Sequence, residues 1–358
     1  FSCWLFFWFW KLQLLLGEAM GLRSLPGFPY INSQAVGGYI GVTLIAIYTS
    51  RKHLLGICKQ FFAAEKSLGD SGKTMSYRTT IIVLLGGTLF LIIFCYQAGI
   101  SITVTIVFFI LFFLISLGIT RMRAELGAPV HDIHYTGPEE IMIWAVGTQK
   151  LGAANLTGLS FFWFLTRTHY SHVMPHQLEG FKLSTSTGIS QKQVTFAMVL
   201  AAGVGILSAF WVLLHIPYQM GALTRIPFPT ISAFGREPWS RLESWLINPS
   251  PANYPETLFL GIGILFTFFL MFMRMKFFWF PLYPAAYAVT NSWGIHNIWF
   301  CLFLAWVVKL VILRFFGLKT HQKAIPFFLG LILGEFTVGC LWTIVGILFG
   351  ISTYGFYT

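Results

Sequence analysis

The chain has 358 residues, of which 56% are hydrophobic and 10% are charged, and its mean hydropathy is +0.73. Because soluble domains carry about 25% charged residues, these values exclude a soluble enzyme, a disordered chain and a secreted disulfide scaffold, and they predict an all-α, polytopic membrane protein. The formal net charge of +11 does not indicate a nucleic-acid partner, since no basic stripe with interleaved aromatic residues occurs; basic loops that face anionic lipid account for it.

The chain begins inside an apolar run, FSCWLFFWFW, without an initiator Met, a charged leader or a cleavage site. We therefore expect that an N-terminal part of the natural protein precedes it. Stretches of about 20 apolar residues are long enough to cross a bilayer. They predict about nine spans within a single integral membrane domain, 1–358, at 1–16, 35–50, 79–97, 100–120, 194–216, 256–273, 277–295, 297–315 and 325–349.

The apolar stretch 138–166 differs from these spans because Lys150, Asn155 and several glycines lie at its centre. It begins with proline and two carboxylates, Glu139 and Glu140, which is typical of a helix N-terminus. The polar centre predicts two half-helices instead of one span. We take Lys150 and Asn155 as candidate residues of a substrate or ion pathway.

The basic residues favour a re-entrant hairpin for 138–166. If this stretch enters and returns on the same side, 16 Lys and Arg residues fall on the cytoplasmic side and four fall outside. A full crossing would place 167–193 and 314–323 outside, against the positive-inside rule. Because non-helical backbone at membrane depth must be surrounded by protein or line a water-filled cavity, we expect 138–166 to line a cavity open to the cytoplasm.

Two later segments are also irregular. Segment 277–295 contains two prolines and Asn291, which predicts a kinked span or, alternatively, a broken helix on a substrate path. Segment 217–255 is rich in proline and is predicted as an external loop. It includes a short amphipathic helix, expected at the lipid surface or, alternatively, as a lid. The apolar face of this helix consists of Trp239, Leu242, Trp245 and Leu246.

Glu335 lies near the middle of the apolar window 325–349. A charged carboxylate at that depth costs about 2.5–3.5 kcal/mol on insertion scales, so it should face a partner inside the bundle. We predict either a proton or cation site on a pathway, or a structural Glu bonded to a neighbouring helix. Lys309 is the candidate partner, with snorkelling to the cytoplasmic surface as its alternative.

Two polar patches flank 138–166, and both are predicted on the cytoplasmic side. Three residues of the first patch, His131, Asp132 and His134, are weak candidates for metal ligands, because their spacing matches no standard zinc pattern. The alternative is a set of loop ion pairs and interfacial histidines. The patches consist of Arg121, Arg123, Glu125, His131, Asp132 and His134, and of His169, His172, His176 and Glu179.

Several runs carry a family likeness: RMRAELGAPVHD, HVMPHQLEGFKL and FPLYPAAYAV…KLVILRFFG…IPFFLGLILGE. They resemble a group of large bacterial multi-spanning membrane proteins of unknown function, over roughly 115–350. The resemblance implies that this chain is the C-terminal portion of a longer protein of the bacterial inner membrane. The group is loosely similar to oligopeptide-transporter-type carriers, which also use re-entrant hairpins.

The interrupted segments and the buried charge favour a secondary transporter that moves a small polar substrate, with Glu335 as the proton carrier. One alternative is a non-transporting scaffold subunit of a larger membrane complex, and another is an intramembrane enzyme acting on lipid-linked substrates. An enzyme is less favoured, because no HExxH, GxSxG, Walker or GxGxxG motif occurs. We predict no catalytic residue and no cofactor. The expected partners are the lipid bilayer and either membrane proteins or further copies of this chain.

Overall fold

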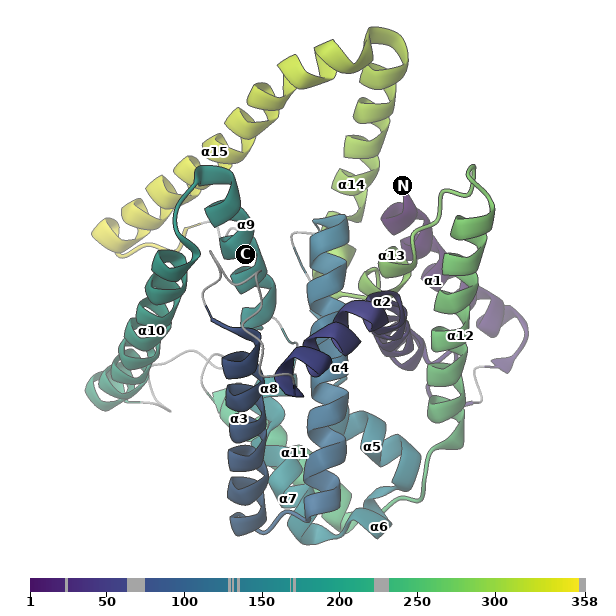
Figure 1. Ribbon diagram of the computed structural model, residues 1–358, viewed down its shortest axis with the longest axis vertical. Helices are drawn as coiled ribbons and strands as arrows, with labels where there is room; N and C mark the ends of the chain where they lie inside the picture. Colours follow the sequence, from purple (N-terminus) through teal and green to yellow (C-terminus); the bar gives the residue numbers. More distant parts are fainter. Residues whose placement is uncertain are drawn as a thin grey trace. The chain divides into compact units, whose positions relative to one another are not determined.

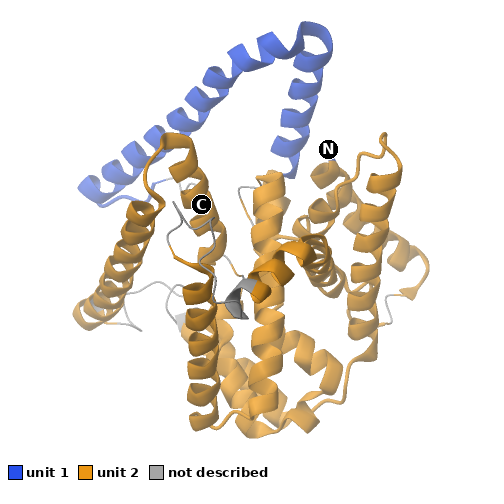
Figure 2. Cartoon of the chain, viewed as in Figure 1, with its two compact units in different colours: residues 1, 299–358 blue, residues 2–298 orange. Residues whose placement is uncertain are grey.

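The computed structural model describes residues 1–22, 25–62, 75–127, 130, 132–133, 136–167, 169, 172–221 and 232–353. Within these ranges every regular element is a helix, which confirms the all-α prediction (Figure 1). The chain divides into two compact units: unit 2 is Ser2–Ile298, and unit 1 is Phe1 together with Trp299–Thr358 (Figure 2). A single integral membrane domain over 1–358 stays a prediction.

Unit 2 contains α1 (Ser2–Ala19), α2 (Ile31–Phe62), α3 (Tyr77–Gln97), α4 (Ile102–Leu126), α5 (Pro138–Val146), α6 (Thr148–Leu151), α7 (Ala153–Phe161), α8 (Trp163–Thr166), α9 (Val173–Thr187), α10 (Gln191–Met220), α11 (Ser232–Ile247), α12 (Tyr254–Lys276), α13 (Pro284–Val289) and the start of α14 (Trp293–Val311). Unit 1 contains the rest of α14, the π-helical turn η2 (Ile312–Phe316) and α15 (Gly317–Phe349).

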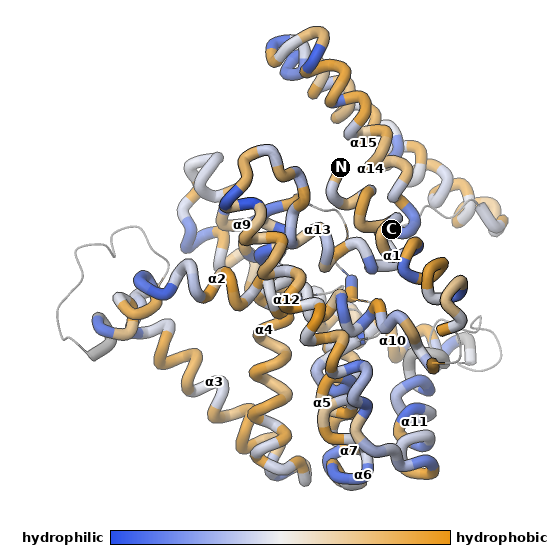
Figure 3. Tube along the Cα trace, turned by 90° about the vertical axis from the view of Figure 1, so that its right-hand side faces the viewer, coloured by the Kyte–Doolittle hydropathy of each residue, from blue (hydrophilic) through white to orange (hydrophobic). Residues whose placement is uncertain are grey.

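Five helical stretches among the described residues are long and apolar enough to cross a membrane: α3, α4, α10, α12 and the run Trp293–Phe349. They support an integral membrane protein, but the count of nine spans is not confirmed. The predicted windows 1–16 and 35–50 do fall on α1 and α2. However, α2 buries Ser33, Gln34 and Thr43 together with several apolar residues in its first half, so this half packs inside unit 2. In Figure 3, α4 is largely orange and α11 largely blue, which separates apolar from polar helices.

The ends of α12 follow directly from its sequence. Asn253 precedes the helix, and its side chain accepts a hydrogen bond from the Glu256 backbone N–H. Pro255 lies in the first turn, where its missing N–H is not needed, and Glu256 lies near the positive end of the helix dipole. Arg274 and Lys276 occupy the last turn, near the negative end.

Helices α2 and α12 cross at a contact that only glycine permits. A Cβ on Gly263 would lie 2.2 Å from the Gln34 carbonyl oxygen, and a Cβ on Gly37 would lie 2.2 Å from the Leu260 carbonyl oxygen. Both distances are much shorter than a van der Waals contact. Both obstructing atoms belong to the backbone, so they cannot move away as the end of a side chain could. The crossing therefore fixes the two helix backbones against each other.

We expect Gly263→Ala to lower the free energy of unfolding by about 1–3 kcal/mol, because the added methyl forces α2 and α12 apart. The measurement is thermal unfolding of the purified protein in detergent. Gly261→Ala, two residues earlier on α12, is the matched control, since a Cβ there meets nothing within 4 Å. Equal melting temperatures for the two variants would contradict the close crossing.

Segment 277–295 is broken rather than kinked. Its only helix before α14 is α13, which has 6 residues, and each of these is buried. Pro284 starts α13, and Thr290, Asn291 and Ser292 separate it from α14. The prediction of one continuous span at 277–295 is therefore wrong. The prolines and the polar residues that suggested the alternative, a broken helix, are the residues at which the helix stops.

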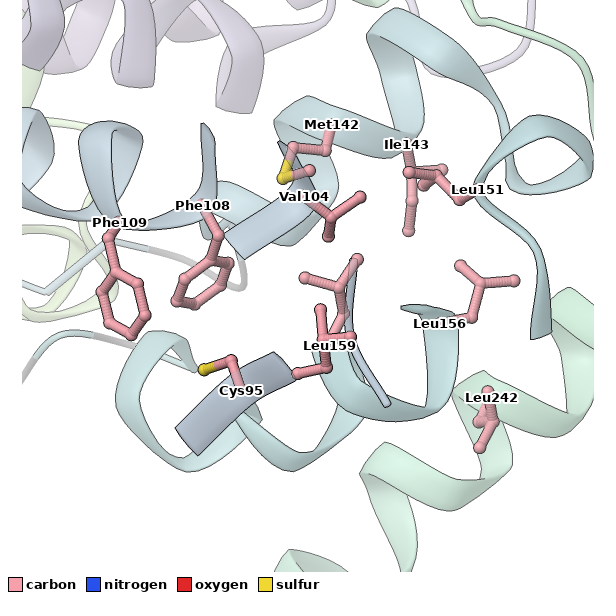
Figure 4. Close-up of a cluster of buried hydrophobic side chains, with 11 residues drawn as sticks. Cys95, Val104, Phe108, Phe109, Met142, Ile143, Leu151, Leu156, Leu159 and Leu242 are labelled. Atoms are coloured by element: carbon pink, nitrogen blue, oxygen red, sulfur yellow. The ribbon is translucent and has the colours of Figure 1, made fainter. Parts of the chain in front are cut away.

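Segment 138–166 is interrupted at its centre, as its glycines predict. Gly147 and Gly152 have φ of 84° and 78°, a backbone region that glycine adopts without strain, and they separate α5, α6 and α7. The segment thus forms four short helices, α5 to α8, instead of two half-helices. Figure 4 shows where they pack: Met142, Ile143, Leu151, Leu156 and Leu159 meet Cys95 of α3, Val104, Phe108 and Phe109 of α4, and Leu242 of α11.

Unit 1 is an apolar helical run with few internal contacts. In the window that qualifies Trp293–Phe349 as a candidate span, none of the residues is buried. Its helix α15 has 33 residues, and ends at Gly350 in the left-handed conformation with φ of 62°. Apolar surface on this scale requires lipid or protein to cover it.

Candidate functional site

The chain after the tip of 138–166 runs beside α4 and in the same direction. At the start of α4, the Ser101 backbone N–H donates to Asn155 Oδ1 over 2.8 Å. Near the end of α4, Arg123 Nε donates to Glu179 Oε1 of α9 over 2.7 Å. Residues 155–179 therefore cover the same length as α4, and the tip of the segment lies level with the turn that joins α3 to α4.

Two ring contacts place the end of 138–166 about a third of the way along α4 from its start. Phe162 stacks on Phe108 with ring centroids 4.7 Å apart, and His169 stacks on Phe112 at 5.9 Å. At a rise of about 1.5 Å per residue, these contacts lie roughly 10–16 Å along α4 from its start. Thr166 lies between them in sequence. If α4 crosses a hydrocarbon core of about 30 Å, Thr166 is close to the midplane.

Helix α11 lies against the other side of the 138–166 segment. Leu242 is buried in the cluster of Figure 4, and Trp245 packs against that cluster. At the end of α11, the Ser250 backbone N–H donates to Thr148 Oγ1 over 2.8 Å, and Asn253 N–H donates to the Trp144 carbonyl over 2.8 Å. The predicted amphipathic helix exists, but its apolar face covers protein instead of lying only on lipid.

Glu139 is the buried carboxyl where the two ends of 138–166 meet. Its side chain is in the first turn of α5, and Thr166 Oγ1 at the end of α8 donates to Glu139 Oε1 over 2.9 Å. Glu139 is 2% exposed, and its second oxygen, Oε2, has no hydrogen-bond partner among the described residues. Gly137 makes this approach possible, because a Cβ there would collide with both Glu139 and Thr166.

Helix α11 encloses Glu139 on the side that the 138–166 segment leaves open. The space beside the carboxyl is lined by Ser160 and Trp163 of the 138–166 segment and by Pro238, Arg241 and Trp245 of α11, and it is too narrow to hold a water molecule. A buried carboxylate without a full set of hydrogen bonds is costly. The arrangement therefore favours the neutral, protonated form of this carboxyl.

Two ion pairs join the ends of 138–166 to α11. Arg241 pairs with Glu140, and both side chains are about one-fifth exposed (22% and 20%). Arg167 Nε lies 3.4 Å from Glu237 Oε2. Each arginine also lies over a tryptophan ring, with Arg241 5.1 Å from the centroid of Trp245. The two pairs therefore fasten both ends of the segment to the same helix.

A protein-family model covers the whole chain, residues 1–358, and its description is "Family of unknown function (DUF6785)". The chain belongs to this family. This agrees with the resemblance to multi-spanning proteins of unknown function, although the match extends over more of the chain than the quoted runs do. No curated protein and no solved structure gives a significant match.

The four predicted pathway residues fall in both units, Lys150 and Asn155 in unit 2 and Glu335 and Lys309 in unit 1. Lys150 is exposed on α6 at the tip of the 138–166 segment, and Asn155 bonds the start of α4 and the Leu151 carbonyl. In unit 1, Glu335 and Lys309 are both exposed, and no ion pair joins them among the described residues. Their roles on a pathway stay predictions.

The two polar patches meet at the C-terminal end of α4. Arg121 pairs with Glu125 one helical turn later, and Glu125 accepts a hydrogen bond from Tyr283. Burial, together with Glu125, raises the pKa of Tyr283 to about 12 and so keeps it a donor. The hydrogen bond from Arg123 holds the pKa of Glu179 below its usual range, and His176 Nδ1 lies 3.7 Å from the same carboxylate.

Asp132 caps a helix. Its carboxylate accepts hydrogen bonds from the backbone N–H groups of Trp293 (3.0 Å) and Gly294 (3.4 Å), at the positive end of α14. The other two metal candidates, His131 and His134, lie outside the described residues. Within the described ranges, no group of three or more His, Cys, Asp or Glu side chains is placed to hold a metal ion.

His169 and His172 lie deeper than a surface patch predicts. His169 is 3% exposed and stacks on Phe112, and the ring of His172 meets the same phenylalanine edge-on at 6.3 Å. The second predicted patch is therefore divided along α4. His169 and His172 lie at Phe112, and His176 and Glu179 lie near the end of the helix, at Arg123.

Sequence reasoning missed Arg241 and Thr166, and it placed Glu139 at a helix N-terminus beside the first polar patch without assigning it to a pathway. A signal for Glu139 does exist, because the run Gly137-Pro138-Glu139-Glu140 puts two acids at the start of an apolar stretch. Nothing in the sequence indicates that Arg241 lies beside them. Its partner, Glu140, is 101 residues away.

Proposed function

We propose that the protein is a secondary transporter for a small polar solute and that Glu139 carries a coupling proton. The observation that supports this most directly is the buried Glu139 carboxyl between the 138–166 segment and α11. In the proposal, each of these two elements crosses only part of the membrane. Discontinuous helices that meet near the midplane are the usual construction of ion and substrate sites in transporters.

The proposed topology keeps the re-entrant hairpin. The chain leaves α4 on the cytoplasmic side and enters the membrane before residue 138. It turns at 147–152, level with the α3–α4 turn, and returns to α9 on the cytoplasmic side. The pair of Arg123 with Glu179 supports this, because it joins the residues before and after the hairpin. Helix α11 would enter from outside. The same proposal includes a location in the bacterial inner membrane, about nine spans and a likeness to oligopeptide-transporter-type carriers.

Cysteine labelling tests this topology. We expect Lys150→Cys and Gln219→Cys to react with a membrane-impermeant maleimide from outside, and Lys182→Cys to react only after permeabilisation. All three side chains are exposed, so burial does not limit the reaction. The measurement is the labelled fraction in intact and permeabilised cells. Labelling of Lys150→Cys and Lys182→Cys from the same side would exclude a hairpin that reaches the outer face.

A flux measurement tests the function. The wild-type protein is reconstituted into liposomes with a pH-sensitive dye inside, and small carboxylates, phosphate, amino acids and dipeptides are added one at a time under an imposed proton gradient. At least one solute should enter together with protons. If no solute in this panel moves protons or accumulates, coupled transport by this site is excluded.

The scaffold alternative draws support from the long apolar run Trp293–Phe349, most of which belongs to unit 1 and which offers a large hydrophobic surface for a partner. It predicts purification with a second protein at fixed stoichiometry and no solute flux in liposomes. The intramembrane-enzyme alternative has no comparable observation, because the Glu139 site is too narrow for water.

A further inference from the structure

Beside the apolar face that packs on the 138–166 segment, α11 has a second face that is polar and hollowed. An open groove of about 430 Å³ is lined by Arg236, Glu237, Ser240, Arg241 and Ser244. These residues recur at helical spacing, so they form a continuous stripe along the helix. Small-molecule sites occupy about 300–1,000 Å³, and the groove falls within that range.

One cation in the groove, Arg236, has no acidic partner in the part of the chain that the structure describes. Arg241 is paired with Glu140, and Glu237 is paired with Arg167. Arg236 is exposed and makes no ion pair among the described residues, and the preceding residues 222–231 contain no acid. The Ser244 hydroxyl makes no hydrogen bond within the same described part. A guanidinium and a hydroxyl that face one space are suited to an oxyanion.

The groove and the site around Glu139 share a residue. Arg241 lines both the open groove and the narrow space beside Glu139. An anion bound in the groove would attract Arg241, and this would weaken the contact between Arg241 and Glu140. Such a movement would loosen the packing of α11 that excludes water from Glu139. The two sites are therefore connected through one side chain.

We propose that the groove on α11 is the substrate site and that it binds a small soluble oxyanion, with a carboxylate or phosphate group held by Arg236. This inference rests on the proposed transport function and specifies its substrate class. The phosphate of an anionic lipid headgroup offers the same chemistry. A soluble anion is favoured, because the stripe of polar residues along α11 would be costly against acyl chains and is suited to water.

Isothermal titration calorimetry on the full chain in phosphatidylcholine nanodiscs tests the proposal. The probes are succinate, inorganic phosphate and, as a neutral analogue, succinamide. We expect an anion to bind, the neutral analogue not to bind, and Arg236→Gln to weaken anion binding by about tenfold or more. Arg78→Gln, at an exposed arginine on α3, is the matched control and should leave the affinity unchanged. The melting temperature of each variant verifies folding.

Three results would overturn the proposal. The first is no heat of binding for succinate or phosphate, and the second is equal anion affinity in Arg236→Gln and wild type. The third is loss of succinate and phosphate binding when phosphatidylglycerol replaces part of the lipid. The last would identify a lipid headgroup as the occupant. Flux measurements separate this proposal from the transport function. Uptake of neutral solutes without anion binding would exclude only the oxyanion site, and anion binding without any flux would exclude only transport.

Discussion

Glu139→Gln is expected to abolish proton-driven accumulation of the transported solute while preserving the fold. The amide has the shape of a protonated carboxyl and can still accept the hydrogen bond from Thr166, but it cannot release a proton. Exchange of solute between the two sides at equal pH should therefore continue. The measurements are gradient-driven uptake and counterflow in the same liposomes.

Folding of this variant needs its own measurement. The amide brings N–H donors to the position of Oε2, which has no partner in the described residues. We expect the free energy of unfolding to change by less than about 2 kcal/mol. Glu335→Gln is the matched comparison, because it makes the same chemical change at an exposed carboxylate in unit 1. If Glu335→Gln loses coupling and Glu139→Gln keeps it, the proton carrier is Glu335, as the sequence alone predicts.

Arg241→Met is expected to be the most destabilising single change around the site, at about 3 kcal/mol. The substitution leaves Glu140 in a largely buried position without its partner, and an uncompensated buried charge costs more than the pair contributes. The pair is about one-fifth exposed (22% and 20%), which places the expected cost at the lower end of the range for buried pairs. Chemical or thermal unfolding in detergent gives the measurement.

The charge-reversed double variant, Glu140→Arg with Arg241→Glu, should recover part of the lost stability, since it restores an ion pair between α5 and α11. Arg123→Met is a control at a more exposed pair, where Glu179 is 51% exposed, and it should cost less than about 1 kcal/mol. An Arg241→Met variant as stable as Arg123→Met would show that the Glu140 pair is solvated and that α11 does not seal the site.

Local interruptions could be predicted from the sequence, because their causes are local. Glycine permits the backbone angles at Gly147 and Gly152, and proline starts α13 where it can no longer continue a preceding helix. The membrane class followed from the scarcity of charge. The count of spans stays a prediction, because hydropathy measures composition and does not distinguish a helix that packs inside the protein from one that faces lipid.

The composition of the site could not be predicted, because it depends on contacts between distant segments. An amphipathic helix has the same pattern whether its apolar face meets lipid or protein, so Leu242 and Trp245 fit either position. Asp132 was a candidate metal ligand because of its neighbours in sequence. Its actual partners are backbone N–H groups 161 and 162 residues away.

The positions of the ion-pair partners along the chain have a consequence for biogenesis. Glu140 and Arg167 are synthesised well before Arg241 and Glu237, which lie on α11. In the proposed topology, Glu140 must therefore enter the membrane before its partner Arg241 exists, at a depth where a charge is expensive. We expect the nascent chain to keep this segment near water or another protein, so that the synthesis of α11 sets the earliest moment at which the core of unit 2 can close.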